Sequence, residues 1–197
     1  MLGGAFNPPH IGHLILAREA IARLGLERVS LVPTGIAPHK TIAADPGAEV
    51  RLELARRAAE GDELIDVEPY EIEQARRGSE PSFMVRTLEA LAERLPGDGL
   101  VLLMGCDAAV GLGAWREPGR VLELASIGVA PRGGLGIEEA TESVRALSQD
   151  VAVEAVDMPA IAISSSLVRE RVRAGLPIRY MVPAGVEQLV ADAGLYA

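Results

Sequence analysis

The chain has 197 residues, of which 49% are hydrophobic, 24% charged and 3% aromatic. This apolar content excludes intrinsic disorder and fibrous repeats, and the length predicts one domain spanning residues 1–197. The net charge of −9 argues against a general nucleic-acid binder, which needs a basic face. A single cysteine, Cys106, excludes an internal disulfide and a cysteine-based zinc cluster.

The sequence gives no sign of a targeting or membrane-spanning segment. Residues 1–4 lack the basic and apolar regions of a signal peptide. The most apolar stretch, residues 99–115, contains Asp107 and is too short to span a membrane. We therefore expect a soluble, cytoplasmic protein that binds neither membrane nor nucleic acid.

Apolar runs and helical patterns alternate along the chain. The runs rich in Val, Leu and Ile predict buried strands at residues 29–32, 64–67, 100–104, 127–130 and 151–156. Helical spacing of apolar residues predicts helices over about 11–24, 50–60, 82–95 with Ser82 as its cap, 138–147, 166–174 and 186–193. This order is typical of a doubly wound, mostly parallel α/β sheet with helices on both faces, in which ligands bind beyond the carboxyl ends of the strands.

Histidine and lysine are confined to the first forty residues. The chain has three histidines and one lysine: His10 and His13 lie in the segment 3–13, and His39 and Lys40 follow Pro38. Glycines and prolines precede His10, and a helix is expected to begin near Ile11, with a positive dipole end and unpaired N–H groups facing this loop. Two imidazoles three positions apart at a helix start can face one anionic centre, so the pattern predicts a phosphate site.

Other interpretations of this segment are weaker. The histidines could simply cap or pack the helix start. Two nitrogen ligands without a nearby carboxylate are too few for a typical metal site, so no metal ligands are predicted. The segment has neither the Walker A pattern nor Gly-x-Gly-x-x-Gly, which disfavours a dinucleotide-binding dehydrogenase.

A second phosphate site is predicted near the C-terminus. Ser164, Ser165 and Ser166 run from an apolar segment into a helix, and one of these serines could act only as a cap. The sequence pattern puts Arg169 in the first helical turn, where a cation is unfavourable unless an anion lies between it and the helix start. Hydroxyls, helix N–H groups and a guanidinium could together bind phosphate. A capped surface helix with solvated arginines is the alternative.

Together the two segments resemble those of the nucleotidyltransferase superfamily that carries a His-x-Gly-His loop and a late serine-arginine loop. The resemblance narrows to the family of bacterial nicotinate-nucleotide adenylyltransferases over essentially the whole chain. It rests on residues 3–13, 38–40, 105–107 followed by Trp115, 163–169 and 178–183, which occur in that order.

The resemblance implies a Rossmann-like fold, with residues 164–197 forming a phosphate-binding helix and a closing helix. It implies transfer of AMP from ATP to nicotinate mononucleotide, giving deamido-NAD and pyrophosphate with the help of Mg²⁺. The implied catalytic residues are His10, His13, Lys40 and Arg169. The implied ATP-binding residues also include Gly4, Ala5, Phe6, Asp107, Ser164, Ser165 and Ser166, and the acceptor-binding residues are His39, Lys40, Thr87 and Trp115.

The sequence departs from the family pattern at three places. Only Met1 and Leu2 precede the Gly-Gly pair, so either the central strand is short or the start codon is assigned too late. Ala5 stands where the family often has Thr or Ser. Met84 replaces a Thr in the segment 82–88, which bears on recognition of the nicotinate.

Four other kinds of protein share part of this pattern. Pantetheine-phosphate adenylyltransferases are the second choice, because they share both phosphate loops but are usually shorter and lack the region of residues 38–40 and Trp115. Cytidylyltransferases are the third choice. Class I aminoacyl-tRNA synthetases share His-Ile-Gly-His, yet this chain has no lysine after Lys40 and no room for a tRNA-binding domain. A non-catalytic nucleotide-binding module would be expected to lose a histidine or the late arginine. The expected partners are ATP and nicotinate mononucleotide, and homo-oligomer formation is left open.

Overall fold

The computed structural model describes residues 1–38, 41–78, 80–131 and 136–197. Its strands are β1 (Leu2–Gly4), β2 (Val29–Pro33), β3 (Ile65–Val67), β4 (Val101–Gly105), β5 (Ser126–Ala130) and β6 (Val153–Ala155). They form one sheet in the order β3-β2-β1-β4-β5-β6, and each neighbouring pair is parallel. The predicted doubly wound parallel sheet is therefore confirmed.

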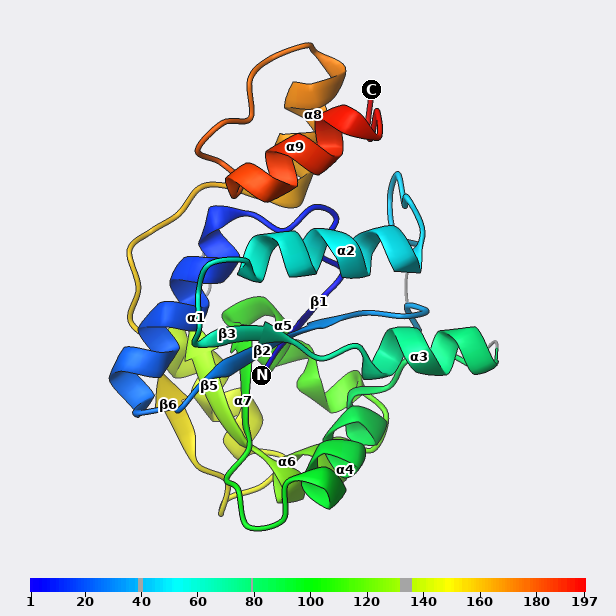
Figure 1. The fold of residues 1–197 in the computed structure, drawn as a ribbon. Coiled ribbons are helices and arrows are strands. Elements are labelled where there is room, and N and C mark those ends of the chain that lie inside the picture. The colour runs from blue at the N-terminus through cyan, green and yellow to red at the C-terminus, as the bar shows by residue number, and fades with distance from the viewer. Residues whose placement is uncertain (39–40, 79, 132–135) are drawn as a thin grey trace.

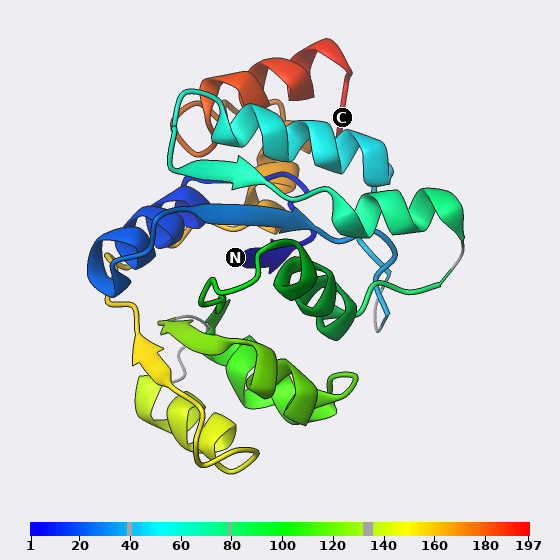
Figure 2. The ribbon, with the colours of Figure 1, turned by 60° about the horizontal axis from the view of Figure 1, so that its bottom comes forward.

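Helices cover both faces of this sheet (Figures 1 and 2). They are α1 (Ile11–Leu24), α2 (Ala48–Ala59), α3 (Tyr70–Arg77), α4 (Met84–Arg94), α5 (Cys106–Val110), the 3-10 helix η1 (Gly111–Ala114), α6 (Pro118–Leu124), α7 (Ile137–Arg145), α8 (Ser165–Arg173) and α9 (Ala184–Asp192). The apolar residues of α1 and α2 pack on one face, and those of α4 to α7 pack on the other.

The strands form where the sequence has runs of apolar residues, whose side chains are buried by helices on both faces of the sheet. Val29, Leu31 and Val32 of β2 are fully buried, as expected for a strand in a parallel sheet. β1 pairs with both β2 and β4. It includes Gly3 and Gly4, the glycine pair that follows Met1 and Leu2. A Cβ at Gly3 would lie 2.7 Å from Cε of Met84, so a side chain there would require the flexible Met84 side chain to move. Gly3 of this strand therefore lies against the side chain of Met84, the first residue of α4.

Most predicted elements agree with the structure to within one or two residues, but the cap assigned to Ser82 is wrong. α4 begins at Met84, and its N-cap is Phe83. The Ser82 hydroxyl instead accepts a hydrogen bond of 3.1 Å from the backbone N–H of Ile36, and its backbone N–H donates to the Ile36 carbonyl. A contact between distant loops competes for this serine, so local sequence preference did not decide its role.

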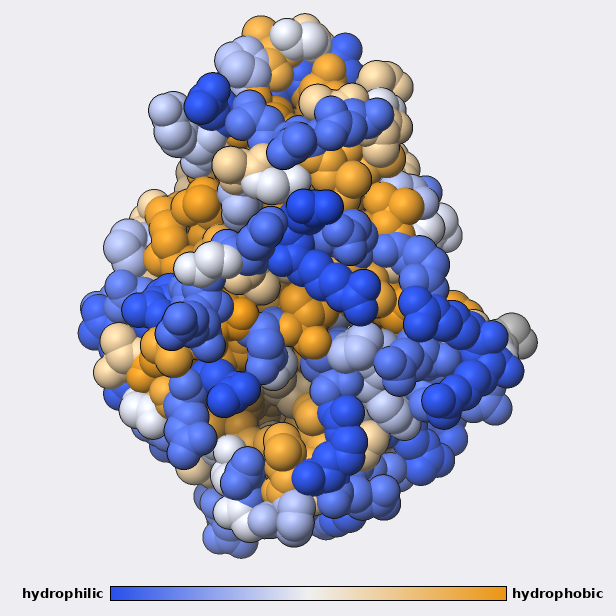
Figure 3. Space-filling model, viewed as in Figure 1, coloured by the Kyte–Doolittle hydropathy of each residue, from blue (hydrophilic) through white to orange (hydrophobic). Residues whose placement is uncertain are grey.

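The C-terminal helices pack on the same side as α1 and α2 and form the top of the molecule in Figure 1. Val168 of α8 and Val186 and Val190 of α9 belong to the apolar cluster that also contains Leu31 and Leu54. This arrangement brings residues 164–197 alongside the loop that follows β1. Within the described residues, no helix is long and apolar enough to cross a membrane. Figure 3 shows that hydrophilic side chains cover most of the face seen in Figure 1, with apolar patches between them.

The strand order locates the site. The chain leaves β1 toward β2 on one side and leaves β4 toward β5 on the other, so β1 and β4 are the neighbours at which the order reverses. In doubly wound sheets, ligands bind at this switch point, beyond the carboxyl ends of the strands. The loop from Ala5 to His10 and the start of α5 follow these two strand ends.

Candidate active site

The two histidines of the first motif form the start of α1. His10 is the N-cap, and its backbone N–H donates a hydrogen bond of 3.0 Å to Nδ1 of His13. Because Nδ1 of His13 accepts this hydrogen, the neutral ring carries its proton on Nε2, which can donate to a phosphate oxygen. The ring centroids of His10 and His13 are 3.8 Å apart. The histidines therefore cap the helix and also lie close together at the predicted phosphate site.

Gly12 is required by the ring of His10. A Cβ at residue 12 would lie 3.0 Å from Cε1 and Nδ1 of His10, and 3.3 Å from Cγ2 of Ile161. Phe6 is buried with a φ of 48°, and its ring meets His13 edge to face at a centroid distance of 5.1 Å. The same ring covers Gly4, where a Cβ would lie 3.5 Å from it. Gly12 thus leaves room for the His10 ring, whereas a Cβ at Gly4 would make only an ordinary contact with Phe6.

One expectation about this loop is wrong. The N–H groups at the start of α1 were expected to be unpaired, but the N–H of Ile11 donates to the Met181 carbonyl at 2.9 Å, and that of His13 donates to the His10 carbonyl at 2.9 Å. Together with the bond from His10 to His13, these contacts occupy three of the helix-start donors. A carbonyl from the C-terminal segment, distant in sequence, supplies one of these partners. The N–H groups of Ile11 and His13 are therefore already paired within the protein.

The three serines of the second motif have three separate roles. The hydroxyl of Ser164 accepts a hydrogen bond of 3.1 Å from the N–H of Leu167, so Ser164 is the N-cap of α8. Ser165 donates a hydrogen bond of 2.8 Å to the Pro8 carbonyl. The hydroxyl of Ser166 accepts one of 3.2 Å from Arg169. The expectation that one serine acts as a cap is confirmed.

Arg169 joins the two motifs. One guanidinium nitrogen donates a hydrogen bond of 2.7 Å to the Asn7 carbonyl, and the other donates to Ser166. The residue lies in the second turn of α8, so its expected place in the first turn is wrong; the helix starts one residue earlier than predicted. None of the described carboxylates forms an ion pair with Arg169, and its Nε is buried without a hydrogen-bond partner. This guanidinium therefore retains an uncompensated positive charge and a spare donor.

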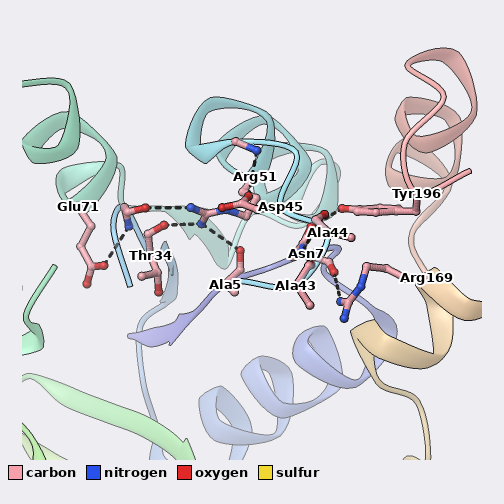
Figure 4. A network of polar contacts seen from close by, with 12 residues as sticks. Ala5, Asn7, Thr34, Ala43, Ala44, Asp45, Arg51, Glu71, Arg169 and Tyr196 are labelled. Carbon is pink, nitrogen blue, oxygen red and sulfur yellow. Dashed lines mark hydrogen bonds and ion pairs between the residues drawn. The ribbon is translucent and has the colours of Figure 1, made fainter. Parts of the chain in front are cut away.

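Asn7 connects the first motif to two further segments (Figure 4). Its carboxamide nitrogen donates to the carbonyls of Ala43, at 2.8 Å, and Ala44, at 3.4 Å. Its carboxamide oxygen accepts a hydrogen bond of 2.6 Å from the hydroxyl of Tyr196. Asn7 is only 2% exposed, so these partners replace water for the carboxamide.

Arg51 of α2 is 1% exposed and holds the loops that follow β1 and β2. Its guanidinium pairs with Asp45 at 2.9 Å and donates to the carbonyls of Ala5 at 3.3 Å, Gly35 at 2.9 Å and Thr34. The loop after β2 leads to the segment containing His39 and Lys40. Arg51 therefore holds the loop after β1 and the start of the loop after β2 together.

Glu71 of α3 binds the other side of the same loop (Figure 4). It accepts hydrogen bonds of 3.4 Å from the N–H of Gly35 and 3.2 Å from the hydroxyl of Thr87. Burial raises the pKa of Glu71 to about 6, against the opposing effects of these hydrogen bonds and of the charge of Arg51. Gly35 cannot carry a side chain, because a Cβ there would lie 2.2 Å from the Glu71 carbonyl oxygen.

The remaining predicted site residues lie at the same end of the sheet or outside the described part. Asp107 is exposed in the first turn of α5, directly after β4. Trp115 follows η1 and is partly buried against the core cluster of α4 to α7. Thr87 is fully buried, and its hydroxyl donates to Glu71. His39 and Lys40 lie outside the described residues, so their predicted roles stay predictions.

The described residues contain no group of three or more His, Cys, Asp or Glu side chains arranged to hold a metal ion. Nucleotidyltransferases of this kind commonly use a divalent metal. Such an ion keeps several waters and binds substrate phosphates with few protein carboxylates.

Sequence reasoning missed Asn7, Arg51, Glu71 and Tyr196 as parts of the site. A signal existed for Arg51, because it shares a helical face with the buried residues Ala55 and Ala58. A charged residue on such a face must find buried partners. Tyr196 and Glu71 gave no such signal, since their partners are far away in the sequence.

Comparison with known proteins agrees with this geometry. A family model described as Cytidylyltransferase-like matches residues 1–171. The class of protein defined by the fold and the site is therefore a cytidylyltransferase-like nucleotidyltransferase.

Curated relatives narrow the class further. A protein of Rubrobacter xylanophilus is 34% identical over 197 residues, covering 100% of this chain and 90% of its own, and one of Tropheryma whipplei is 37% identical, covering 99% and 97%. Both carry the description "Probable nicotinate-nucleotide adenylyltransferase". The chain belongs to the family of nicotinate-nucleotide adenylyltransferases.

A solved structure shares the fold. The Plasmodium falciparum nicotinic acid mononucleotide adenylyltransferase complexed with NaAD matches with a TM-score of 0.77 at 16% sequence identity. The match covers 99% of this chain and 95% of that one. The arrangement of the sheet and its helices, including the C-terminal pair, is thus common to both proteins.

Proposed function

We propose that this chain transfers AMP from ATP to nicotinate mononucleotide, forming deamido-NAD and releasing pyrophosphate. One observation carries the proposal: the His10–His13 helix start and the Ser165–Arg169 segment meet at the switch point, joined through the carbonyls of Asn7 and Pro8. The names of the curated relatives supply the acceptor.

In the proposed reaction, the phosphate of nicotinate mononucleotide attacks the α-phosphorus of ATP. The bond to the bridging oxygen of pyrophosphate breaks as the new phosphoanhydride bond forms. Such a transfer depends on alignment and charge neutralisation and needs no covalent nucleophile on the protein. His13, with its Nε2 proton, and His10 would donate to the oxygens of the α-phosphate. Gly4, Ala5 and Phe6 would form the wall of this loop.

Arg169 would bind the β- and γ-phosphates as they become the leaving pyrophosphate. Its lack of an ion pair with the described carboxylates supports this role. The hydroxyls of Ser165 and Ser166, together with Lys40 and His39, would complete the contacts with the phosphates, while Ser164 would cap α8. Asp107 would lie near the adenosine, and Trp115 and Thr87 would belong to the acceptor side.

We propose Mg²⁺ as the divalent ion. It would enter with ATP, bound mainly by phosphate oxygens and water, and would neutralise part of the phosphate charge. The chain's own contribution is then the orientation of the triphosphate by His10, His13 and Arg169. We also propose a cytoplasmic location, and homo-oligomer formation is left open.

A turnover assay tests the function. The protein is mixed with ATP, Mg²⁺ and one acceptor at a time, and pyrophosphate release is measured with nicotinate mononucleotide, nicotinamide mononucleotide and phosphopantetheine. We expect the highest kcat/KM with nicotinate mononucleotide. Release with phosphopantetheine alone would identify a pantetheine-phosphate adenylyltransferase instead. Absence of pyrophosphate release with every acceptor would favour a non-catalytic nucleotide-binding module.

A further inference from the structure

Tyr196, the penultimate residue of the chain, reaches the active-site loop. α9 ends at Asp192, and the chain then turns through Gly194, with a φ of 58°, and Tyr196, with a φ of 67°. The N–H of Leu195 donates to the Val190 carbonyl at 3.0 Å, which closes the turn onto α9. The turn directs the phenol of Tyr196 toward Asn7, which lies 189 positions earlier in the sequence.

The contacts of Asn7 define how its carboxamide is oriented. The nitrogen donates to the carbonyls of Ala43 and Ala44, so it must face the 43–44 turn. The oxygen must therefore face Tyr196, whose hydroxyl donates to it at 2.6 Å. The opposite orientation would set the carboxamide oxygen against two carbonyl oxygens. Tyr196 is thus the partner that satisfies the oxygen when the nitrogen holds the turn.

Three segments of the site converge on this one residue (Figure 4). The backbone of Asn7 is part of the loop that leads into His10 and His13, and its carbonyl accepts the hydrogen bond from Arg169. The 43–44 turn precedes Asp45, which pairs with the buried Arg51. A rotation of the carboxamide would release the turn while Asn7 remains bound to Arg169.

We propose that Tyr196 is a positioning residue for ATP binding, because its hydroxyl fixes the Asn7 carboxamide and so joins the 43–44 turn to the loop between β1 and α1. The inference rests on the proposed function for the identity of the nucleotide. Tyr196 acts through Asn7 and is assigned no contact with substrate.

The phenol of Tyr196 is well suited to donate this hydrogen bond. Burial raises the pKa of Tyr196, although the nearby charge of Arg169 opposes this shift. The hydroxyl therefore keeps its proton throughout the pH range in which the protein would work. The ring contributes separately, because it packs against the apolar cluster of α1, α2, α8 and α9.

The Tyr196→Phe variant separates these two contributions, since it keeps the ring and removes only the hydroxyl. The matched control is Tyr180→Phe, which removes the same hydroxyl from a side chain that is 84% exposed. For each variant we would measure the Kd for ATP by calorimetry, kcat and KM with nicotinate mononucleotide, and the unfolding temperature. We expect Tyr196→Phe to raise the Kd and the KM for ATP about tenfold, with kcat changed less, because a buried acceptor loses its donor. Tyr180→Phe should match the wild type.

A role in packing alone gives a different result. If Tyr196→Phe lowers only the unfolding temperature and leaves the Kd and KM for ATP unchanged, the inference is wrong. An equal rise of the Kd in Tyr180→Phe would also overturn it. In an Asn7→Ala background, Tyr196→Phe should have no further effect on ATP affinity, and a second tenfold loss would show that Tyr196 does not act through Asn7.

Measurement of the Kd for ATP by calorimetry needs no acceptor, so it tests the positioning role of Tyr196 whatever the turnover assay shows. A wild type that binds ATP but releases no pyrophosphate with nicotinate mononucleotide would refute the proposed function. The comparison of ATP affinities between the wild type and Tyr196→Phe would still support or overturn the positioning role.

Discussion

The guanidinium of Arg169 donates a hydrogen bond of 2.7 Å to the backbone carbonyl of Asn7, 162 positions earlier in the chain. A second bond, from Ser165 to the Pro8 carbonyl, lies beside it. These contacts join α8 to the loop that leads into His10 and His13. The two motifs therefore lie side by side, as the proposed binding of one triphosphate by both requires.

Arg169→Ala should lower kcat/KM roughly 10²–10³-fold, because it removes the charge proposed to bind the departing pyrophosphate. Arg169→Lys should have a kcat/KM between those of Arg169→Ala and the wild type, since one ammonium group cannot replace a guanidinium that reaches two acceptors. Steady-state pyrophosphate release measures both effects. Arg173→Ala, at the exposed end of the same helix, is the control, and an equal loss in that variant would remove the specific role of Arg169.

His13→Ala should lower turnover roughly 10²–10³-fold, because it removes a donor to the α-phosphate. It should also lower the free energy of unfolding by about 0.5–2 kcal/mol, since Nδ1 of His13 accepts the N–H of the N-cap residue. His13→Gln retains an acceptor at the third helical position, where Gln commonly serves in a capping box. We expect His13→Gln to keep the stability and still lose turnover; normal turnover in either variant would exclude His13 from the mechanism.

Arg51→Ala should lower the free energy of unfolding by about 3–5 kcal/mol, because the buried guanidinium binds Asp45 and the carbonyls of two loops. Urea unfolding measures this change. Arg56→Ala, on the same helix but exposed, should change the free energy by no more than about 0.5 kcal/mol. Similar losses in both variants would show that the contacts of Arg51 add no specific stability.

Glu71→Gln should show how the buried carboxyl group links stability to pH. The pKa of Glu71 in the folded state, about 6, is above its ordinary value of 4.5, so the folded state binds the proton more tightly. The stability that Glu71 contributes is therefore full below about pH 4.5 and is lost as the pH rises through about 6. Relative to Glu71→Gln, the wild type should lose about 2 kcal/mol between about pH 4 and pH 7.

The pH experiment has a control of opposite sign. The hydrogen bond from Arg76 lowers the pKa of Glu49, which is exposed on α2. Relative to Glu49→Gln, the wild type should gain stability as the pH rises. Urea unfolding at several pH values measures both pairs, and a constant difference between wild type and Glu71→Gln would contradict the expected burial of the charge.

The sequence by itself determined the fold class and the two motifs. Runs such as residues 29–32 can be buried on both faces only between two layers of helices, and the alternating helical patterns supply those layers. The contacts between His10 and His13 join residues three positions apart. Local geometry therefore made the start of α1 predictable.

Only the tertiary structure decided how the donors are used. Ser82 binds the loop at Ile36 and leaves the cap of α4 to Phe83, and the N–H of Ile11 binds Met181 where an anion was expected. The roles of Asn7, Arg51, Glu71 and Tyr196 also depend on partners between 6 and 189 positions away. A buried donor or acceptor takes whichever partner the packed chain brings within about 3 Å, and that choice depends on how helices and loops come together rather than on the neighbouring residues in the sequence.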